Sequence, residues 1–252
     1  YAPNNAVLLI VGEVDPPEGF RLAQQYFGDI PSNSLPAQAD VSEPPQKEER
    51  RGAVEEPFGT LPAIAIGYQA PARRTPDWFA LAMLDQALHG GRAGRIHRRL
   101  VLEKQVAVET EGGIQYPVGN LFDYNGPTLM VTRILHKPEY SAEKTLETYD
   151  EVIGEVQEKG VSEDELEQVK VKFRSDYYSM LEGGMGGYMP RYGLMHLLAC
   201  FALFDGEPGL VNTILGGFQK VTRARLQTAA QKFLVPRNRS IVLRQPVQKG
   251  VS

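Results

Sequence analysis

The chain has 252 residues, of which 42% are hydrophobic and 23% are charged, the composition of an ordinary globular protein with a buried core. Its formal net charge of -4 gives no general attraction to nucleic acid or to anionic membranes. A single cysteine, Cys200, excludes an internal disulfide, and no run approaches the ~20 apolar residues of a membrane span. We therefore expect a soluble protein that binds neither nucleic acid nor membranes.

The chain opens on "YAPNNAVLLIVGEVD", which has neither an initiator methionine nor a signal-peptide pattern. We expect a piece of a longer protein, so that any targeting signal lies outside the sequence. Residues 6–12, "AVLLIVG", are continuously apolar and predict a buried strand. A helix is predicted at residues 16–28, with Asp15 as its cap. Residues 31–52 are polar and proline-rich, and this composition predicts a linker.

The remainder of the chain predicts a group of strands followed by a group of helices. Strands are expected at residues 61–71, 106–116, 126–136 and 239–246. Helices are expected at residues 75–90, 94–104, 141–160, 162–182, 190–204, 207–218 and 222–234. Hairpin-like succession of strands with a block of helices is typical of an α+β fold. We predict a mostly antiparallel sheet with helices packed on one face.

The stretch "GGRAGRIHRRLVLEKQVAV", residues 90–108, is the most chemically suggestive. Its glycines lie between two predicted helices and no Lys-Ser/Thr follows, so a tight turn is favoured over a phosphate-binding loop. Its basic side chains could bind a carboxylate or a phosphate, but a solvated helix face is favoured because the whole chain is acidic. These side chains are Arg92, Arg95, Arg98 and Arg99.

The histidines do not predict a metal site. A helical zinc site needs two ligands one turn apart and a carboxylate nearby. No histidine is followed by such a pair at the third and fourth positions, and Pro138 interrupts the turn after one of them. Cys200 fits a buried apolar filler, and no G-x-S-x-G elbow occurs. The histidines tested are His89, His97, His136 and His196.

An ordered set of segments resembles the pitrilysin-like (M16) zinc metallopeptidases over nearly the whole chain. The segments are "YAPNNAVLLIVGEVDP", "YFGDIP", "GYQAP", "DWFALAMLDQALHGGRAGRIHRRLVLEK" and "VSEDELEQVK". The resemblance implies an M16 peptidase/LuxS-like α+β half. It further implies that residues 1–30 are the terminal strand and helix of a preceding metallopeptidase domain, residues 31–56 a Pro-rich linker, and residues 57–252 the inactive C-terminal domain.

The family's zinc motif, H-x-x-E-H with a distal Glu, is absent here, and the resemblance places it upstream of Tyr1. Many relatives carry L-R-E-K-x-x-x-A-Y in the second domain, where the Arg and the Tyr hold substrate carbonyls. On this alignment Val101 and Val108 occupy the Arg and Tyr positions, and valine cannot donate a hydrogen bond to a carbonyl. We therefore expect no catalytic residue and no metal ligand in this chain, with zinc only in the upstream domain.

Substrate-contact candidates come from two places. One is the segment "GGMGG", for which a plain connector between helices is favoured; the other is the arginine-rich helix. The candidates are Gly184, Gly186, Gly187, Arg98 and Arg99.

The resemblance implies a chain that is inactive alone and that forms one wall of a peptide chamber. The implied partners are its own zinc-bearing N-terminal domain, a related M16 subunit in a homodimer or heterodimer, and peptide substrates. The possibility that a partner subunit supplies the missing Arg and Tyr is left open. Two alternatives also stay open, a structural relative of the respiratory-complex core type and a peptide-binding or chaperone-like relative. A periplasmic or secreted location is implied, with the mitochondrial matrix or the bacterial cytoplasm as alternatives.

Overall fold

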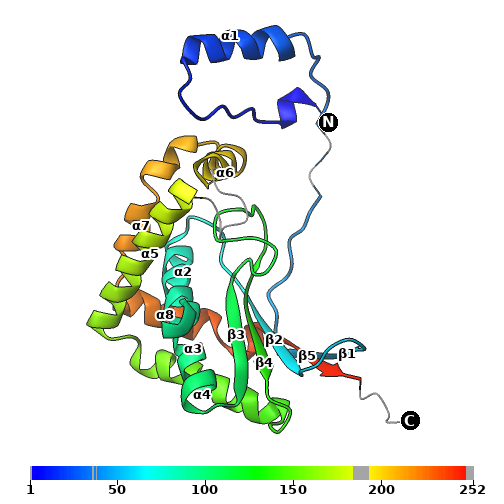
Figure 1. Cartoon of the computed structure of the whole chain (residues 1–252), viewed down its shortest axis with the longest axis vertical. Helices are drawn as coiled ribbons and strands as arrows, with labels where there is room; N and C mark the ends of the chain where they lie inside the picture. The colour runs from blue at the N-terminus through cyan, green and yellow to red at the C-terminus, as the bar shows by residue number, and fades with distance from the viewer. Residues whose placement is uncertain (1, 36, 38, 184–192, 248–252) are drawn as a thin grey trace. The chain divides into compact units, whose positions relative to one another are not determined.

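The computed structural model describes residues 2–35, 37, 39–183 and 193–247 (Figure 1). Contacts divide the chain into two compact units. We call residues 42–173 and 216–252 the larger unit, and residues 1–41 and 174–215 the smaller unit. Each unit is described separately.

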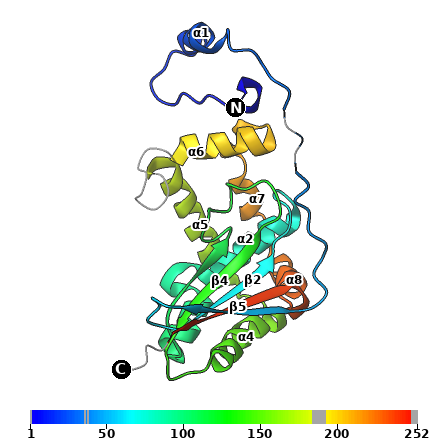
Figure 2. The same cartoon turned by 90° about the vertical axis from the view of Figure 1, so that its right-hand side faces the viewer.

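The larger unit is built on a sheet of five strands among its described residues, in the order β1-β5-β2-β4-β3. Figure 2 shows β4, β2 and β5 side by side in this order. Every neighbouring pair is antiparallel except β1 with β5, which is parallel. The expected α+β fold with a mostly antiparallel sheet is confirmed. The strands are β1 (Arg50–Glu56), β2 (Ala63–Gln69), β3 (Ala107–Ile114), β4 (Leu129–His136) and β5 (Arg239–Pro246).

The two faces of this sheet differ in burial. In β2 the side chains of Ile64, Ile66 and Tyr68 are buried, whereas the alternate positions are small residues such as Ala65. Side chains alternate across a strand, so one face of the sheet packs on helices and the other is left uncovered within this unit. We call the second face the open face. It carries Val54, Ala65, Glu109, Glu111, Leu129, Val131, Arg133 and Val242.

Several helices of the larger unit begin at residues whose side chains cap the helix, as the sequence predicts. The Thr75 hydroxyl accepts a hydrogen bond from Trp78 N (3.2 Å), and the Ser162 hydroxyl accepts one from Glu165 N (3.1 Å). The helix α5 begins in the larger unit and ends in the smaller one. The helices are α2 (Pro76–His89), α3 (Arg95–His97) with the π-helical turn η3 (Arg98–Glu103), α4 (Ala142–Lys159), α5 (Glu163–Gly183), α7 (Leu215–Gln219) and α8 (Arg223–Phe233).

An aromatic cluster fills the core beneath α2. Trp78 is fully buried, and its ring lies 5.1 Å from Phe218 and 6.2 Å from Phe122. Its indole Nε1 donates to the Tyr124 hydroxyl (2.9 Å), which satisfies the only polar atom of this side chain. Burial raises the pKa of Tyr124 to about 12, so this hydroxyl stays protonated. The cluster ties α2 and α7 to the loop between β3 and β4.

The smaller unit contains the short turn η1 (Pro3–Asn5), the helix α1 (Pro16–Phe27), the end of α5, α6 (Gly193–Cys200), η4 (Phe201–Asp205) and η5 (Pro208–Asn212). The helix α1 begins and ends within one residue of the prediction. Residues 6–12, expected as a buried strand, pair with no strand in the described chain, and most of their side chains are exposed. The described residues between 31 and 49 form neither helix nor strand, whereas Arg50–Glu56, assigned to the linker, is β1.

Candidate functional site

The two valines that the alignment places at the Arg and Tyr positions lie on neighbouring elements. Val101 is in η3, and Val108 follows it at the start of β3 with its side chain half-exposed. Neither side chain has a polar atom. The assignment of these positions to the family's helper pair stays a prediction.

Arg95 and Glu165 join the turn before β3 to α5. The guanidinium donates from Nε and Nη2 to the two carboxylate oxygens at 2.7 and 2.6 Å. This bidentate geometry gives strong, directional pairs. The hydrogen bond to Glu165 raises the pKa of Arg95. Burial pushes the pKa of Glu165 upward, but the bond from Arg95 outweighs it and holds that pKa below its ordinary value.

The two candidate arginines are also paired within the larger unit. Arg99 lies 2.7 Å from Glu155 of α4 and 3.0 Å from Glu103 of its own turn. Arg98, more exposed, lies 3.3 Å from Glu103. Arg95 and Arg99 thus form ion pairs between helices, whereas the ion pair of Arg98 lies within η3. The glycine candidates Gly184, Gly186 and Gly187 lie outside the described residues.

A buried polar network surrounds His89, and the sequence motifs did not predict it. His89 Nδ1 lies 2.6 Å from Asp85 Oδ1, and Nε2 lies 2.8 Å from Thr132 Oγ1. An acid, an imidazole and a hydroxyl in this order form the arrangement of nucleophilic catalysis. Thr132, however, is fully buried, so no substrate reaches its hydroxyl. The spacing of Asp85 and His89, one helical turn apart, is the signal in the sequence that could have indicated this pair.

The network continues across the sheet to Arg239. The Tyr149 hydroxyl lies 3.4 Å from Thr132 Oγ1 and is hydrogen-bonded to Tyr68. Burial raises the pKa values of both tyrosines, so both remain neutral. Tyr68 is in turn hydrogen-bonded to Arg239, whose guanidinium contacts Glu49 and Asp150. These contacts join α4, β5 and the segment before β1.

Metal ligands are sparse in the part of the chain that the structure describes, which holds no group of three or more His, Cys, Asp and Glu able to bind an ion. One pair of possible ligands is His196 and Cys200 on α6, where the sulfur lies 3.6 Å from Nε2. A structural zinc site needs four ligands and a catalytic one needs three.

We expect this chain to retain less than one tenth of an equivalent of zinc after dialysis, as measured by metal analysis. Two ligands on one helix hold zinc only weakly, so any binding in a calorimetric titration should disappear in the variant Cys200→Ser. One tightly held equivalent that survives this substitution would contradict the expectation.

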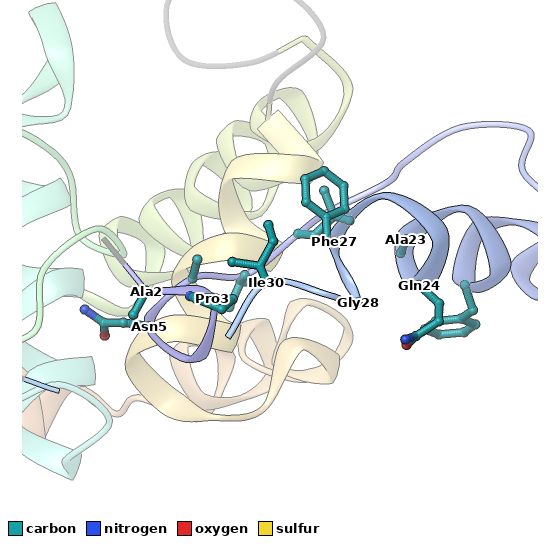
Figure 3. A pocket seen from close by; sticks show the side chains of 12 residues that line it. Ala2, Pro3, Asn5, Ala23, Gln24, Phe27, Gly28 and Ile30 are labelled. Carbon is teal, nitrogen blue, oxygen red and sulfur yellow. The ribbon is translucent and has the colours of Figure 1, made fainter. Parts of the chain in front are cut away.

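The first thirty residues expose an apolar surface. A cavity of about 730 Å³ lies between the segment after η1 and the helix α1 (Figure 3). A second cavity of about 400 Å³ adjoins the next part of the same segment. Phe20, which borders both, is 77% exposed. Large exposed apolar patches mark interaction sites in soluble proteins. Other exposed side chains here are Val7, Leu8, Ile10, Phe27 and Ile30.

Residues 1–173 match the family model described as the M16 peptidase inactive domain. The chain belongs to the M16 peptidase family. Among curated proteins it is similar to the zinc protease PqqE of Helicobacter pylori, with 23% identity over 185 residues, which are 72% of this chain and 40% of that protein.

Solved structures show the same fold. A protease from Helicobacter pylori has a TM-score of 0.78 and 20% identity, covering 94% of this chain and 54% of that one. The M16 peptidase inactive domain from Pseudomonas fluorescens has a TM-score of 0.73 and 17% identity, and the match covers 93% of this chain and 52% of that one. The periplasmic protease PqqL of Escherichia coli has a TM-score of 0.66 and 17% identity, and the match covers 93% of this chain and 24% of that one. The chain therefore spans about half the length, or less, of these relatives.

The expectation of an M16 inactive C-terminal domain is confirmed by the family match. Among the described helices, none is both long enough and apolar enough to cross a membrane.

Proposed function

We propose that this chain is the non-catalytic half of a zinc peptidase that encloses unfolded peptides. In this proposal residues 1–30 complete an upstream zinc-bearing domain, and the larger unit supplies a wall of the peptide chamber. The upstream domain holds the zinc and cleaves the peptide. The observation that carries the proposal is the uncovered apolar surface of residues 2–30.

This surface needs a partner for physical reasons. A single twelve-residue helix has little stability in water unless its apolar face packs on something. Phe20, Phe27 and Leu8 are exposed, and each would contribute about 1.5–3 kcal/mol when fully buried. The similar proteins are about twice as long as this chain, which leaves room for a domain that covers the surface. The three-part division at residues 30 and 56 is part of the proposal.

The open face of the sheet supports the role of chamber wall. It combines aliphatic side chains such as Val131 and Val242 with small ones such as Ala65, and Val242 is exposed. It has no helical cover within the larger unit. Such a surface of mixed size and polarity suits an enclosed peptide of varied sequence. The same unit could also dock on a related M16 subunit, as a homodimer or a heterodimer.

Two alternative functions remain candidates, a structural relative without proteolysis and a peptide-binding or chaperone-like relative. The upstream sequence separates them, because an intact H-x-x-E-H supports the peptidase and a degraded one supports a structural role. We propose a periplasmic or secreted location, since one structural neighbour, PqqL, is described as a periplasmic protease. A signal peptide on the full-length protein would support it.

The docking role of residues 1–30 predicts an unequal effect of two matched substitutions in the full-length protein. Phe20→Ser should lower its free energy of unfolding by about 2 kcal/mol, because the ring would lose a buried site. It should also reduce zinc-dependent peptide cleavage. Gln25→Ser, on the same helix but outside the cavity lining, should change stability by less than about 0.5 kcal/mol.

In the 252-residue chain alone, neither substitution should shift thermal unfolding, because Phe20 is already exposed there. Equal effects of the two substitutions in the full-length protein, or destabilisation of the isolated chain by Phe20→Ser, would remove the support for docking.

A further inference from the structure

The strand β1 forms one edge of the sheet, with β5 on one side and no strand of the described chain on the other (Figure 1). Its outward main-chain groups follow from one hydrogen bond. Val247 N donates to Glu56 O at 3.2 Å, so Glu56 and the residues of β1 with the same parity turn their N–H and C=O toward β5. Residues of the other parity turn away from β5. The outward groups therefore belong to Arg51, Ala53 and Glu55.

The charges of this strand are antisymmetric about its central residue, Ala53. In the sequence "RRGAVEE", two arginines precede Ala53 by two and three positions, and two glutamates follow it at the same separations. The first six residues of the strand are exposed. Charge on an edge strand normally discourages pairing with another chain. Here the sign of the charge reverses along the strand, so an antiparallel copy of the same strand presents an opposite charge to each charged residue.

One antiparallel register satisfies both the main chain and the charges. With Ala53 opposite Ala53 of a second copy, the three outward residues of each copy face one another and can exchange hydrogen bonds. The same register places Arg51 opposite Glu55 and Arg50 opposite Glu56, and the symmetry of the pair gives each contact twice. Opposite charges on directly opposed residues stabilise a pair of strands.

The neighbouring registers and the parallel arrangement do not satisfy the charges. Moving the centre of pairing to Gly52 places Glu55 opposite Glu49, which is a repulsive pair. Moving it to Val54 leaves the four charged residues of the strand without an opposite charge. Parallel pairing in register places arginine opposite arginine and glutamate opposite glutamate. The charges therefore select one arrangement of two copies.

We propose that β1 pairs with β1 of a second copy of this chain, so that two five-stranded sheets join into one. The charged side chains are accessible for this contact. Among the described residues, no ion pair is formed by Arg50, Glu55 or Glu56. Arg51 contacts Glu49 through Nε at 2.5 Å, but its side chain is 52% exposed and its terminal nitrogens can reach a second carboxylate.

The apolar residues of β1 also fit this register. The exposed side chain of Val54 would lie opposite Gly52 of the second copy on the open face. A Cβ at Gly52 would meet nothing within 4 Å, so there is room for the valine. One seven-residue strand per copy buries less surface than the roughly 1,200 Å² of a stable interface. We therefore expect a dimer that forms at high protein concentration and dissociates on dilution.

The direct test is sedimentation equilibrium of the 252-residue chain over a series of protein concentrations. We expect a reversible equilibrium between monomer and dimer that weakens as salt is raised, because the ion pairs of the interface are exposed. Arg50→Glu alone and Glu56→Arg alone should each weaken association at least about tenfold, because each places like charges opposite one another at two points.

The charge pattern predicts that the two defective variants rescue each other. An equimolar mixture of Arg50→Glu and Glu56→Arg should form a heterodimer, because every contact between positions 50 and 56 again joins opposite charges. The double variant, with both substitutions in one chain, should associate with itself for the same reason. A chain that stays monomeric at every concentration would overturn the proposal, as would single variants that associate like the unsubstituted chain.

Cross-linking tests the register independently of charge. In a Cys200→Ser background, Ala53→Cys should give a disulfide-linked dimer under mild oxidation, because directly opposed residues with outward main-chain groups lie about 5.5 Å apart between Cα atoms. Glu55→Cys is the matched control and should not cross-link, since its opposed residue is Arg51. Equal cross-linking of the two variants would overturn the proposed register.

The failure of this inference differs from failure of the proposed function, to which it adds a defined interface for a homodimer. Full-length protein that cleaves peptides with zinc but stays monomeric would overturn the pairing of β1 and leave the peptidase role standing. Full-length protein without zinc-dependent cleavage that dimerises through β1 would do the reverse.

Discussion

Arg239→Leu is expected to lower the free energy of unfolding by about 3 kcal/mol, because it leaves charges without their partner in a partly buried site. The Arg239 side chain is only 7% exposed. Its Nε donates to Glu49 Oε2 at 2.6 Å and its Nη1 to Asp150 Oδ1 at 2.5 Å. The guanidinium thus joins the segment before β1, β5 and α4 at one point, and also contacts Tyr68.

Two other arginine substitutions test this explanation. Arg51→Leu removes a guanidinium that also contacts Glu49, at 2.5 Å, but this side chain is 52% exposed, and we expect a loss of about 0.5 kcal/mol. Arg239→Lys keeps the charge but loses the fork that reaches two carboxylates, so an intermediate loss is expected. Urea unfolding followed by tryptophan fluorescence suits the measurement, since Trp78 is the only tryptophan and lies in the core of the same unit. Similar losses for Arg51→Leu and Arg239→Leu would contradict the explanation.

The loss from Arg239→Leu should also depend on pH. Burial pushes the pKa of Glu49 upward, but hydrogen bonds from Arg51 and Arg239 outweigh it and hold that pKa below its ordinary value of 4.5. A carboxyl with a depressed pKa in the folded state contributes stability above pH 4.5 that is lost as the pH falls through the folded pKa. The difference between the unsubstituted protein and Arg239→Leu should therefore shrink in acid below pH 4.5.

Local signals in the sequence were sufficient to predict the helices and strands that line the core. Thr75 before a proline predicted the start of α2, and the structure has the corresponding cap bond to Trp78 N. The run around Ile64 and Ile66 predicted β2, because apolar residues bounded by prolines favour a buried strand. The type and the position of each of these elements are determined by residues within the element or directly beside it.

Elements that depend on distant partners could not be predicted in this way. The sequence "RRGAVEE" of β1 has the charges of a solvated segment, and it is a strand because β5 pairs with it, each residue with a partner 190 positions later. Residues 6–12 show the opposite case, since their apolar run fits a strand but no strand of the described chain pairs with them. The His89 network also depends on distance, because Thr132 approaches only when β4 packs beneath α2.

The glycine facing this network supplies the last prediction: Gly112→Ala should lower the free energy of unfolding by about 3 kcal/mol, near the upper end for overpacking. A Cβ at Gly112 would lie 2.4 Å from Val131 O and 2.6 Å from the His89 ring. The carbonyl belongs to the neighbouring strand and cannot move without distorting the sheet. The imidazole is held on its two sides by Asp85 and Thr132, so it cannot rotate away without breaking those contacts.

A glycine on the opposite edge of the same sheet provides the control. A Cβ at Gly52 of β1 would meet nothing within 4 Å, so Gly52→Ala should change stability by less than about 0.5 kcal/mol or increase it slightly. Removing the imidazole should relieve only part of the clash, since Val131 O remains. The double variant Gly112→Ala with His89→Ala should therefore be more stable than the sum of the two single losses predicts. Additive losses would show that the His89 ring does not restrict this position, and equal stabilities of Gly112→Ala and Gly52→Ala would show that neither contact does.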